Sequence, residues 1–305
     1  MNLVAFLSSN SDTTHTAVAA GGHAEPQSVG ELFAVLFHHV QDSPEMELPF
    51  LGHVHLPHFD PIRLGGLTLD ISITKHVVFL WFAAALLILV ASIAARANRK
   101  NRVPTGWGNL MEMFIVFVRD EIVIPNMGTA GVRYLPYVLT TFFYILLMNL
   151  LGLIPYGSSA TGNISVTAGL AIIAFVMIQV SSIKAQGFGH YLAHLTGGVP
   201  WPLWPIMIPI EILGLFTKPF ALCIRLFANM TGGHLVIVSL FGLIFIFKSY
   251  PIAITTAAFV VAINFLELFV AFLQAYVFTM LTCIFMGLGM QSGHADEEHG
   301  EEHAH

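Results

Sequence analysis

Two apolar segments of exceptional length near the C-terminus constrain the fold most. Residues 206–247 and 251–291 are separated only by the three residues KSY, and Pro251 begins the second segment. Each is about twice the ~20 residues that a helix needs to cross ~30 Å of hydrocarbon. Such a segment must tilt strongly, bend, or run partly outside the bilayer. We therefore predict an all-α integral membrane protein with a long, tilted C-terminal helical hairpin.

Composition and three shorter apolar runs support this interpretation. Hydrophobic residues make up 56% of the chain and charged residues 10%, against about 25% charged in soluble domains. Residues 76–95, 134–154 and 164–183 are each long enough to span a membrane. Together with the hairpin they predict five transmembrane crossings within a membrane domain at 71–291. The basic cluster at 96–102 predicts a cytoplasmic end for the first span.

A sixth apolar stretch, residues 107–124, carries too many charges to cross readily. Glu112, Arg119, Asp120 and Glu121 interrupt it. An amphipathic helix of this kind typically lies in the plane of the membrane surface. We expect an interfacial helix here, between the first and second crossings.

The two terminal segments are polar and rich in histidine. Residues 1–70 predict an extramembrane, periplasmic segment with little regular structure, and residues 292–305 an acidic cytoplasmic tail. The sequence HVHLPH at 53–58 has three imidazoles that could bind a metal, but a solvated loop is the favoured interpretation because no matching ligands stand at a set spacing. The tail is interpreted in the same way. A cleaved signal peptide is disfavoured because no Lys or Arg precedes Arg63.

Charged side chains inside the hairpin need a reason, because a central Arg or Asp costs about 2.5–3.5 kcal/mol even on the translocon scale. Glu211, Lys218 and Arg225 recur at intervals of seven residues, and Asn229 follows four residues later. All four therefore share one helical face. Glu211 and Arg225 are about 21 Å apart along the axis, too far for direct pairing.

The returning segment has a matching polar face. Glu267 is its only fully charged residue before the tail, and Gln274 follows seven residues later. An antiparallel return brings Glu267 to a depth similar to that of His234. We therefore expect two polar tracks along a common seam, with an imidazole and a carboxylate close together.

These residue types suit a proton path that is broken in the middle. His and Glu exchange protons near neutral pH, whereas a guanidinium with a pKa above 12 cannot release its proton. Simpler alternatives stay open at this point. Arg225 could hold a structural ion pair with Glu211 or Glu267, His234 could be a packing residue, and Glu211 could be solvated. Lys218 is expected to reach the cytoplasmic headgroups and is left out of the path.

Two stretches of the hairpin resemble a known family. IRLFANMTGGH at 224–234 and FLELFVAFLQAYVF at 265–278 are similar to subunit a of the F-type ATP synthase membrane sector, F0. The resemblance extends from about residue 70 onward. It implies that Arg225 is the essential stator arginine, which faces a rotating ring of c subunits that each bear an ion-carrying carboxylate. Ala228 departs from the pattern, since many relatives have Gly there.

The resemblance also implies roles for the other polar residues. Glu211 would line a half-channel on the cytoplasmic side, and His234 with Glu267 the half-channel on the outer side. In some relatives the acid and the imidazole are exchanged between the last two positions. Asn229 and Gln274 match the asparagine and glutamine of the family pattern. The residues expected in the proton path are Glu211, Asn229, His234, Glu267 and Gln274.

The family implies a function that this chain performs only inside a complex. Its partners would be the c-subunit ring, the b-subunit peripheral stalk, the remaining ATP synthase subunits and the lipid bilayer of the bacterial inner membrane. The chain has no phosphate-binding GxxxxGK[ST] motif, so ATP chemistry would lie elsewhere. No cofactor, metal or nucleic acid is expected. The alternative is a self-contained proton-coupled secondary transporter, for which inverted repeats would be the evidence.

Overall fold

Seven helices make up most of the chain in a computed structural model, which describes residues 45–48, 52–55, 62–64, 67–69, 75–100, 106–154, 160–189, 191, 201–247 and 249–291. Five helices in these ranges are long and apolar enough to cross a membrane. The predicted all-α fold with five long apolar helices is therefore confirmed. The α-helices are α3 (Lys75–Lys100), α4 (Trp107–Phe117), α5 (Ile124–Met127), α6 (Leu135–Gly152), α7 (Ile164–Gln186), α9 (Trp204–Phe247) and α10 (Tyr250–Gln291).

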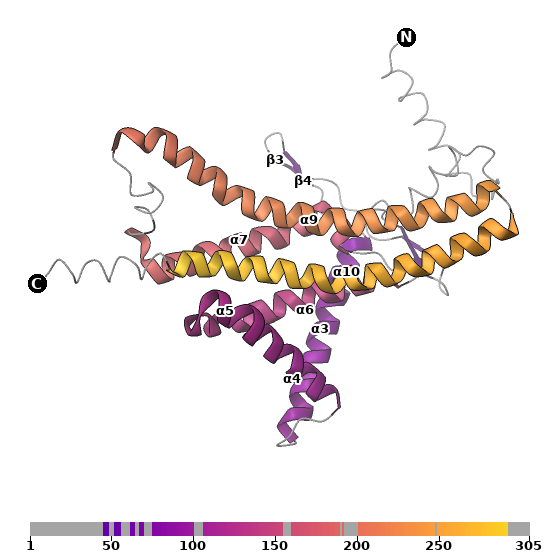
Figure 1. Ribbon diagram of the computed structural model, residues 1–305, viewed down its shortest axis with the longest axis horizontal. Coiled ribbons are helices and arrows are strands. Elements are labelled where there is room, and N and C mark those ends of the chain that lie inside the picture. Colours follow the sequence, from indigo (N-terminus) through magenta and orange to yellow (C-terminus); the bar gives the residue numbers. More distant parts are fainter. Residues whose placement is uncertain are drawn as a thin grey trace, which may run out of the picture.

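The C-terminal hairpin is the longest feature of the molecule. Helices α9 and α10 have 44 and 42 residues and run side by side in opposite directions (Figure 1). At 1.5 Å per residue α9 is about 66 Å long, roughly twice the thickness of bilayer hydrocarbon. Its connected end projects beyond the shorter helices, and α3 crosses the pair at a steep angle (Figure 1). A helix of this length fits a membrane only if it tilts strongly, bends, or runs partly outside the hydrocarbon, as expected from the sequence.

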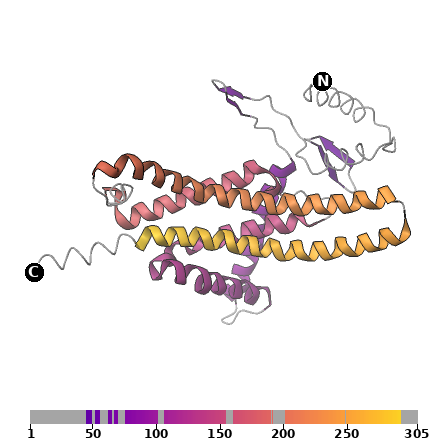
Figure 2. The same cartoon turned by 45° about the horizontal axis from the view of Figure 1, so that its top comes forward.

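Helices α6 and α7 pack along the other end of the hairpin. Contacts join α6 to α10, and α7 to both α9 and α10, and Figure 2 shows these helices alongside one half of the pair. Phe142 and Ile145 of α6 and Phe278 of α10 are fully buried between them. Helices α6 and α7 therefore support the seam, the line along which α9 and α10 contact each other, in one half of the hairpin only. The residues from Lys218 to Gln274 that are considered below lie along that seam, whereas Glu211 lies near the start of α9.

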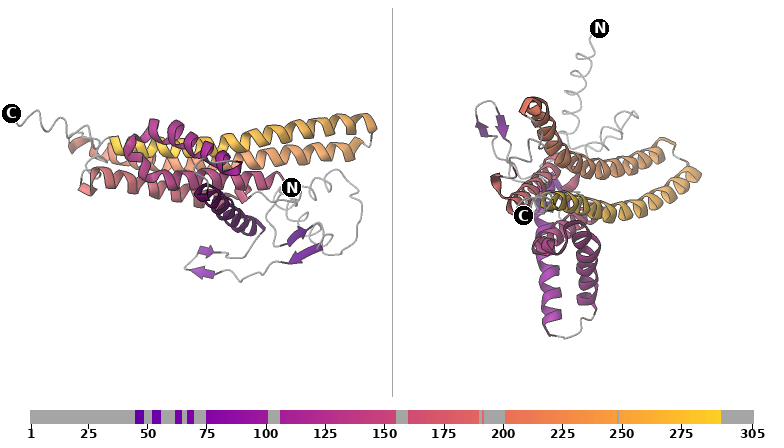
Figure 3. Two further views of the ribbon diagram at one scale, coloured as in Figure 1. Left: turned by 90° about the horizontal axis from the view of Figure 1, so that it is seen from below. Right: turned by 60° about the vertical axis from the view of Figure 1, so that its left-hand side comes forward.

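The predicted interfacial helix consists of three pieces. Helix α4 passes into a π-helix, η1 (Val118–Val123), and then into α5. Val118 and Ile122 are fully buried, whereas the adjacent Arg119 and Asp120 form an exposed ion pair at 2.7 Å. The hydrogen bond from Arg119 lowers the pKa of Asp120. Helices α3 and α4 contact each other and project together from the bundle (Figure 3), and the placement of α4 at a membrane surface stays a prediction.

Short connecting turns link the helices. A 3-10 turn, η2 (Thr129–Tyr134), leads from α5 into α6, and two more, η3 (Ala160–Gly162) and η4 (Trp201–Leu203), precede α7 and α9. Asn163 caps α7, because its side chain accepts a hydrogen bond of 2.8 Å from the backbone N–H of Ser165.

Two β-hairpins lie within the segment for which the sequence predicts little regular structure. Strand β1 (Glu45–Leu48) pairs antiparallel with β2 (Gly52–His55), and β3 (Ile62–Leu64) pairs with β4 (Leu67–Leu69). Of HVHLPH, residues 56–58 lie outside the described residues, as do the tail at 292–305 and the N-terminal residues considered as a signal peptide. The part of the chain that the structure describes contains no group of three metal-ligating side chains.

Two glycines near the end of α10 permit close packing with the neighbouring helices. A Cβ atom on Gly287 would collide with the backbone carbonyl oxygen of Asn126, which follows η1. A Cβ atom on Gly289 would collide with the hydroxyl of Ser182 on α7, and the amide of Gln186 donates a hydrogen bond to the Gly289 carbonyl. Small residues of this kind allow membrane helices to approach closely.

Gly287→Ala should therefore destabilise the protein, although alanine favours a helix by about 1 kcal/mol over glycine. The colliding atom belongs to the backbone and cannot turn aside, so we expect a net loss of about 1–3 kcal/mol. Thermal unfolding of the protein in detergent measures this loss as a lower Tm. Gly169→Ala on α7 is the matched control, because nothing lies within 4 Å of its added Cβ. A Tm equal to that of the control would contradict the packing argument.

Candidate functional site

Arg225 lies on the exposed side of the seam between α9 and α10. Its side chain has no ion-pair or hydrogen-bond partner among the residues that the structure describes. Together with Lys218 of α9 and with Leu281 and Phe285 of α10 it lines an open cavity of about 400 Å³. The structure therefore places the cation where another molecule can reach it.

Lys218 shares this cavity but takes a different position. Its ammonium nitrogen lies 5.0 Å from the centre of the Phe285 ring, a cation–π arrangement. The sequence predicts contact with headgroups, and the ring contact adds a partner within the protein. Lys218 is thus held against α10, whereas the Arg225 guanidinium is not.

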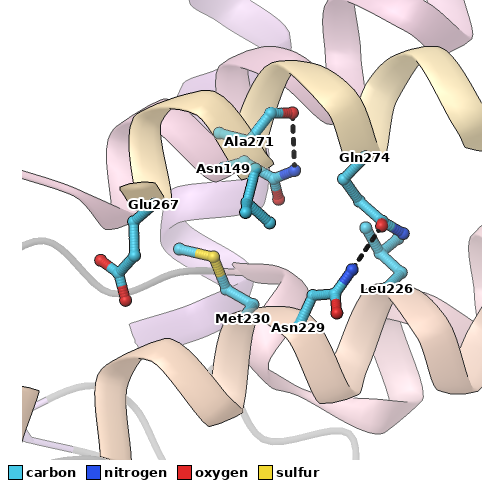
Figure 4. A pocket seen from close by; sticks show the side chains of 8 residues that line it. Asn149, Leu226, Asn229, Met230, Glu267, Ala271 and Gln274 are labelled. Carbon is cyan, nitrogen blue, oxygen red and sulfur yellow. Dashed lines mark hydrogen bonds between the residues drawn. The ribbon is translucent and has the colours of Figure 1, made fainter. Parts of the chain in front are cut away.

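Asn229 and Gln274 join the two helices directly. The Asn229 amide donates a hydrogen bond of 2.7 Å to the Gln274 carbonyl oxygen (Figure 4). Gln274 is almost fully buried, and its Nε2 has no hydrogen-bond partner within the described ranges. An unpaired buried donor is costly, so this amide has the capacity to bind one more acceptor.

His234 and Glu267 meet across the same seam. The His234 Nδ1 and the Glu267 Oε1 are 4.0 Å apart, and both side chains are largely buried. Neither of these two atoms has a hydrogen-bond partner among the described residues. Figure 4 shows the Glu267 side chain extending from α10 toward α9. The antiparallel return thus brings the imidazole and the carboxylate together, as the sequence led us to expect.

Asn149 of α6 also belongs to this group, although sequence reasoning did not select it. Its Nδ2 donates to the Ala271 carbonyl at 3.4 Å, and its Oδ1 accepts a hydrogen bond of 2.8 Å from Thr161. It lines a cavity of about 20 Å³ with Asn229 and Glu267, which has room for about one water molecule. The available signal was a lone amide within the apolar run 134–154.

Glu211 stands apart from the other polar residues. Its side chain is half-buried. The pKa of the nearby Tyr191 is raised, mainly because the Tyr191 side chain is itself partly buried and secondly because of the negative charge of Glu211. Fourteen residues separate it from Arg225, about 21 Å along α9. The structure therefore brings together His234 with Glu267, and Asn229 with Gln274, but leaves Glu211 at the far end of the track.

Comparison with known proteins identifies the family. The sequence profile of the ATP synthase A chain matches residues 77–287. The chain belongs to the ATP synthase subunit a family. It is 50% identical to ATP synthase subunit a 2 of Chlorobaculum tepidum over 94% of this chain and 80% of that protein. It is 48% identical to ATP synthase subunit a of Myxococcus xanthus over 86% of this chain and 95% of that protein.

Family membership confirms the function predicted from the sequence. The subunit a family provides the proton-conducting stator subunit of the F0 membrane sector, and the synthesis of ATP resides in other subunits. The chain is thus a multi-pass membrane component of a bacterial ATP synthase rather than a self-contained transporter.

Proposed function

We propose that Arg225 is the stator charge of two offset proton half-channels, and that it faces the carboxylates of a rotating c-subunit ring. The observation that carries this proposal is an exposed guanidinium without a partner among the described residues of its own chain. A permanent cation at membrane depth is costly unless an anion compensates it. A ring carboxylate that arrives at the seam supplies this anion.

The two half-channels enter the seam from opposite ends. Glu211 and the cavity of about 400 Å³ beside Arg225 belong to the cytoplasmic half-channel. His234 and Glu267, 4.0 Å apart, belong to the outer one, and Asn229 and Gln274 lie between them and Arg225. A proton cannot pass directly from one side to the other, because the guanidinium does not release its own proton.

Rotation follows from the cost of exposing a charge to lipid. A carboxylate that faces hydrocarbon must be neutral, whereas one that faces Arg225 can ionise. Each ring carboxylate therefore takes up a proton from one half-channel before it leaves the seam, and releases one to the other half-channel when it returns. Each proton that crosses provides ~2.3 kcal/mol per 100 mV of membrane potential. The offset between the half-channels converts this energy into directed rotation.

The same proposal fixes orientation and partners. The basic residues at 96–102 lie on the cytoplasmic side, which places the C-terminal tail in the cytoplasm and the N-terminal segment in the periplasm of a bacterial inner membrane. A b-subunit peripheral stalk holds the chain against the torque of the ring. The exposed apolar side chains of the projecting α3 and α4, such as Trp81 and Trp107, are available to lipid and to this stalk.

Disulfide crosslinking tests whether the Arg225 face meets the ring. Ala221 and Ala228 are exposed and flank Arg225 on α9. Cysteine at either position should form a disulfide with a cysteine placed beside the ring carboxylate, visible as a combined band on a non-reducing gel. Ile172→Cys on the exposed side of α7 is the control and should give no such product. Absence of product from both positions, in a complex that assembles, would contradict the proposed interface.

A further inference from the structure

Gly233 of α9 has an unusual neighbour. A Cβ atom built on this glycine would meet three atoms, and all three belong to Glu267: the carboxylate Oε1, the carboxyl carbon and Cγ. The adjacent Gly232 has nothing within 4 Å of the corresponding position. The volume that any other residue at 233 would fill is therefore occupied by the Glu267 side chain.

Other close-packed glycines of the described chain have different neighbours. Gly287 makes room for the backbone at Asn126, Gly289 for the Ser182 side chain, and Gly131 for Val123 and Met127. These contacts join helices or turns. At Gly233, in contrast, the space is filled by an ionisable group that reaches across the seam. A glycine within a helix costs about 1 kcal/mol relative to alanine, so its presence here needs a specific reason.

The reason lies in the position of the carboxylate. Gly233 directly precedes His234, whose Nδ1 is 4.0 Å from Glu267 Oε1. We propose that Gly233 is a positioning residue, which lets the Glu267 carboxylate lie against the backbone of α9 beside His234. This inference rests on the proposed role of Glu267 in the outer half-channel and adds the element that sets its geometry.

A displaced carboxylate has no equivalent place within the seam. The cavity beside it, which Asn149 and Asn229 also line, is about 20 Å³ and has room for about one water molecule. A methyl group at position 233 therefore turns the Glu267 side chain away from His234. Misplacement of a reacting group by about 1 Å can reduce a rate on the order of a hundredfold.

The experiment compares Gly233→Ala with Gly169→Ala in the whole ATP synthase in sealed vesicles. Both replace a helical glycine, but position 169 on α7 has open space for the added Cβ. We expect Gly233→Ala to reduce ATP-driven proton pumping on the order of tenfold to a hundredfold and to shift its pH profile. We expect Gly169→Ala to change neither. A normal rate and pH profile for an assembled Gly233→Ala complex would overturn the inference.

A second substitution separates positioning from a general packing defect. Glu267→Asp shortens the side chain by one methylene and relieves the collision, so Gly233→Ala with Glu267→Asp should be more active than Gly233→Ala alone. If Gly233→Ala does not assemble, the same pair should restore assembly. A pair that is no better than Gly233→Ala in either respect would contradict the proposal.

The broader proposal has its own readout in the same assay. Glu267→Gln should stop pumping if Glu267 carries protons. Pumping at the normal rate by this variant would show that the role of Glu267 is wrong. Loss of pumping with Glu267→Gln but normal pumping with Gly233→Ala would show that only the positioning role is wrong.

Discussion

Arg225→Ala should abolish ATP-driven proton pumping by the assembled complex. In the proposed mechanism, the substitution removes the cation that attracts a ring carboxylate and that separates the two half-channels. Nothing in the described chain replaces it, because the nearby Lys218 is held 5.0 Å from the Phe285 ring centre. Inverted vesicles with a pH-sensitive dye measure both ATP-driven pumping and passive leak. We expect no pumping and an increased leak.

Two substitutions control this experiment. Arg133→Gln removes an exposed cation that lies 4.9 Å from the Tyr134 ring, far along the chain from the seam, and should leave pumping unchanged. Arg225→Lys keeps the charge but replaces a planar guanidinium, which can bind a carboxylate through two parallel hydrogen bonds, by a compact ammonium group, so it should not restore full activity. Pumping at a normal rate by assembled Arg225→Ala complexes would disprove the proposed mechanism.

Exchange of the acid and the imidazole should give the second largest effect. His234→Glu alone places a second carboxylate beside Glu267, at a position where the His234 Nδ1 lies 4.0 Å from Glu267 Oε1. Two carboxylates in such proximity oppose joint ionisation. Glu267→His alone removes the carboxylate. We expect each single substitution to reduce pumping on the order of a hundredfold, and the double exchange to recover part of it, because a proton-exchanging pair is present again.

The comparison of the single and double variants shows whether His234 and Glu267 act together. Recovery in the double variant shows that the two positions act on each other, as expected from the 4.0 Å separation of Nδ1 and Oε1. Losses that simply add, with no recovery, would mean that His234 and Glu267 act independently. His76 of α3 is also buried, and His76→Gln tests whether the effect is specific to His234.

Much of the fold follows from apolar length alone. The predicted segments 206–247 and 251–291 correspond to α9 at Trp204–Phe247 and α10 at Tyr250–Gln291, because the polar turn is the only interruption. The π-helix at Val118–Val123 was not predictable in this way, since a local change of helical period depends on what each side packs against. The β-hairpins between 45 and 69 were also missed, because strands of three or four residues leave little periodic signal.

The contacts of the site were predictable where they follow from the antiparallel pairing of α9 and α10. Antiparallel geometry after the turn places Glu267 opposite His234 and, seven residues on, Gln274 opposite Asn229. Asn149 and Gly233 were not selected, because their importance depends on the third helix and on the space beside one residue. Single amides and glycines also occur in membrane helices for packing alone, so neither residue type marks a proton path by itself.

Under the proposed mechanism, the inclination of the hairpin has a consequence for the sense of rotation. Glu211 and His234 are 23 residues apart, about 35 Å along α9. With α3 upright in the membrane, a steeply inclined α9 turns most of that length into sideways displacement along the rim of the rotor (Figure 1). The direction in which α9 tilts then decides whether a ring carboxylate that is protonated at one half-channel must travel clockwise or anticlockwise to reach the other half-channel. The chirality of the motor would thus depend on the slope of one helix.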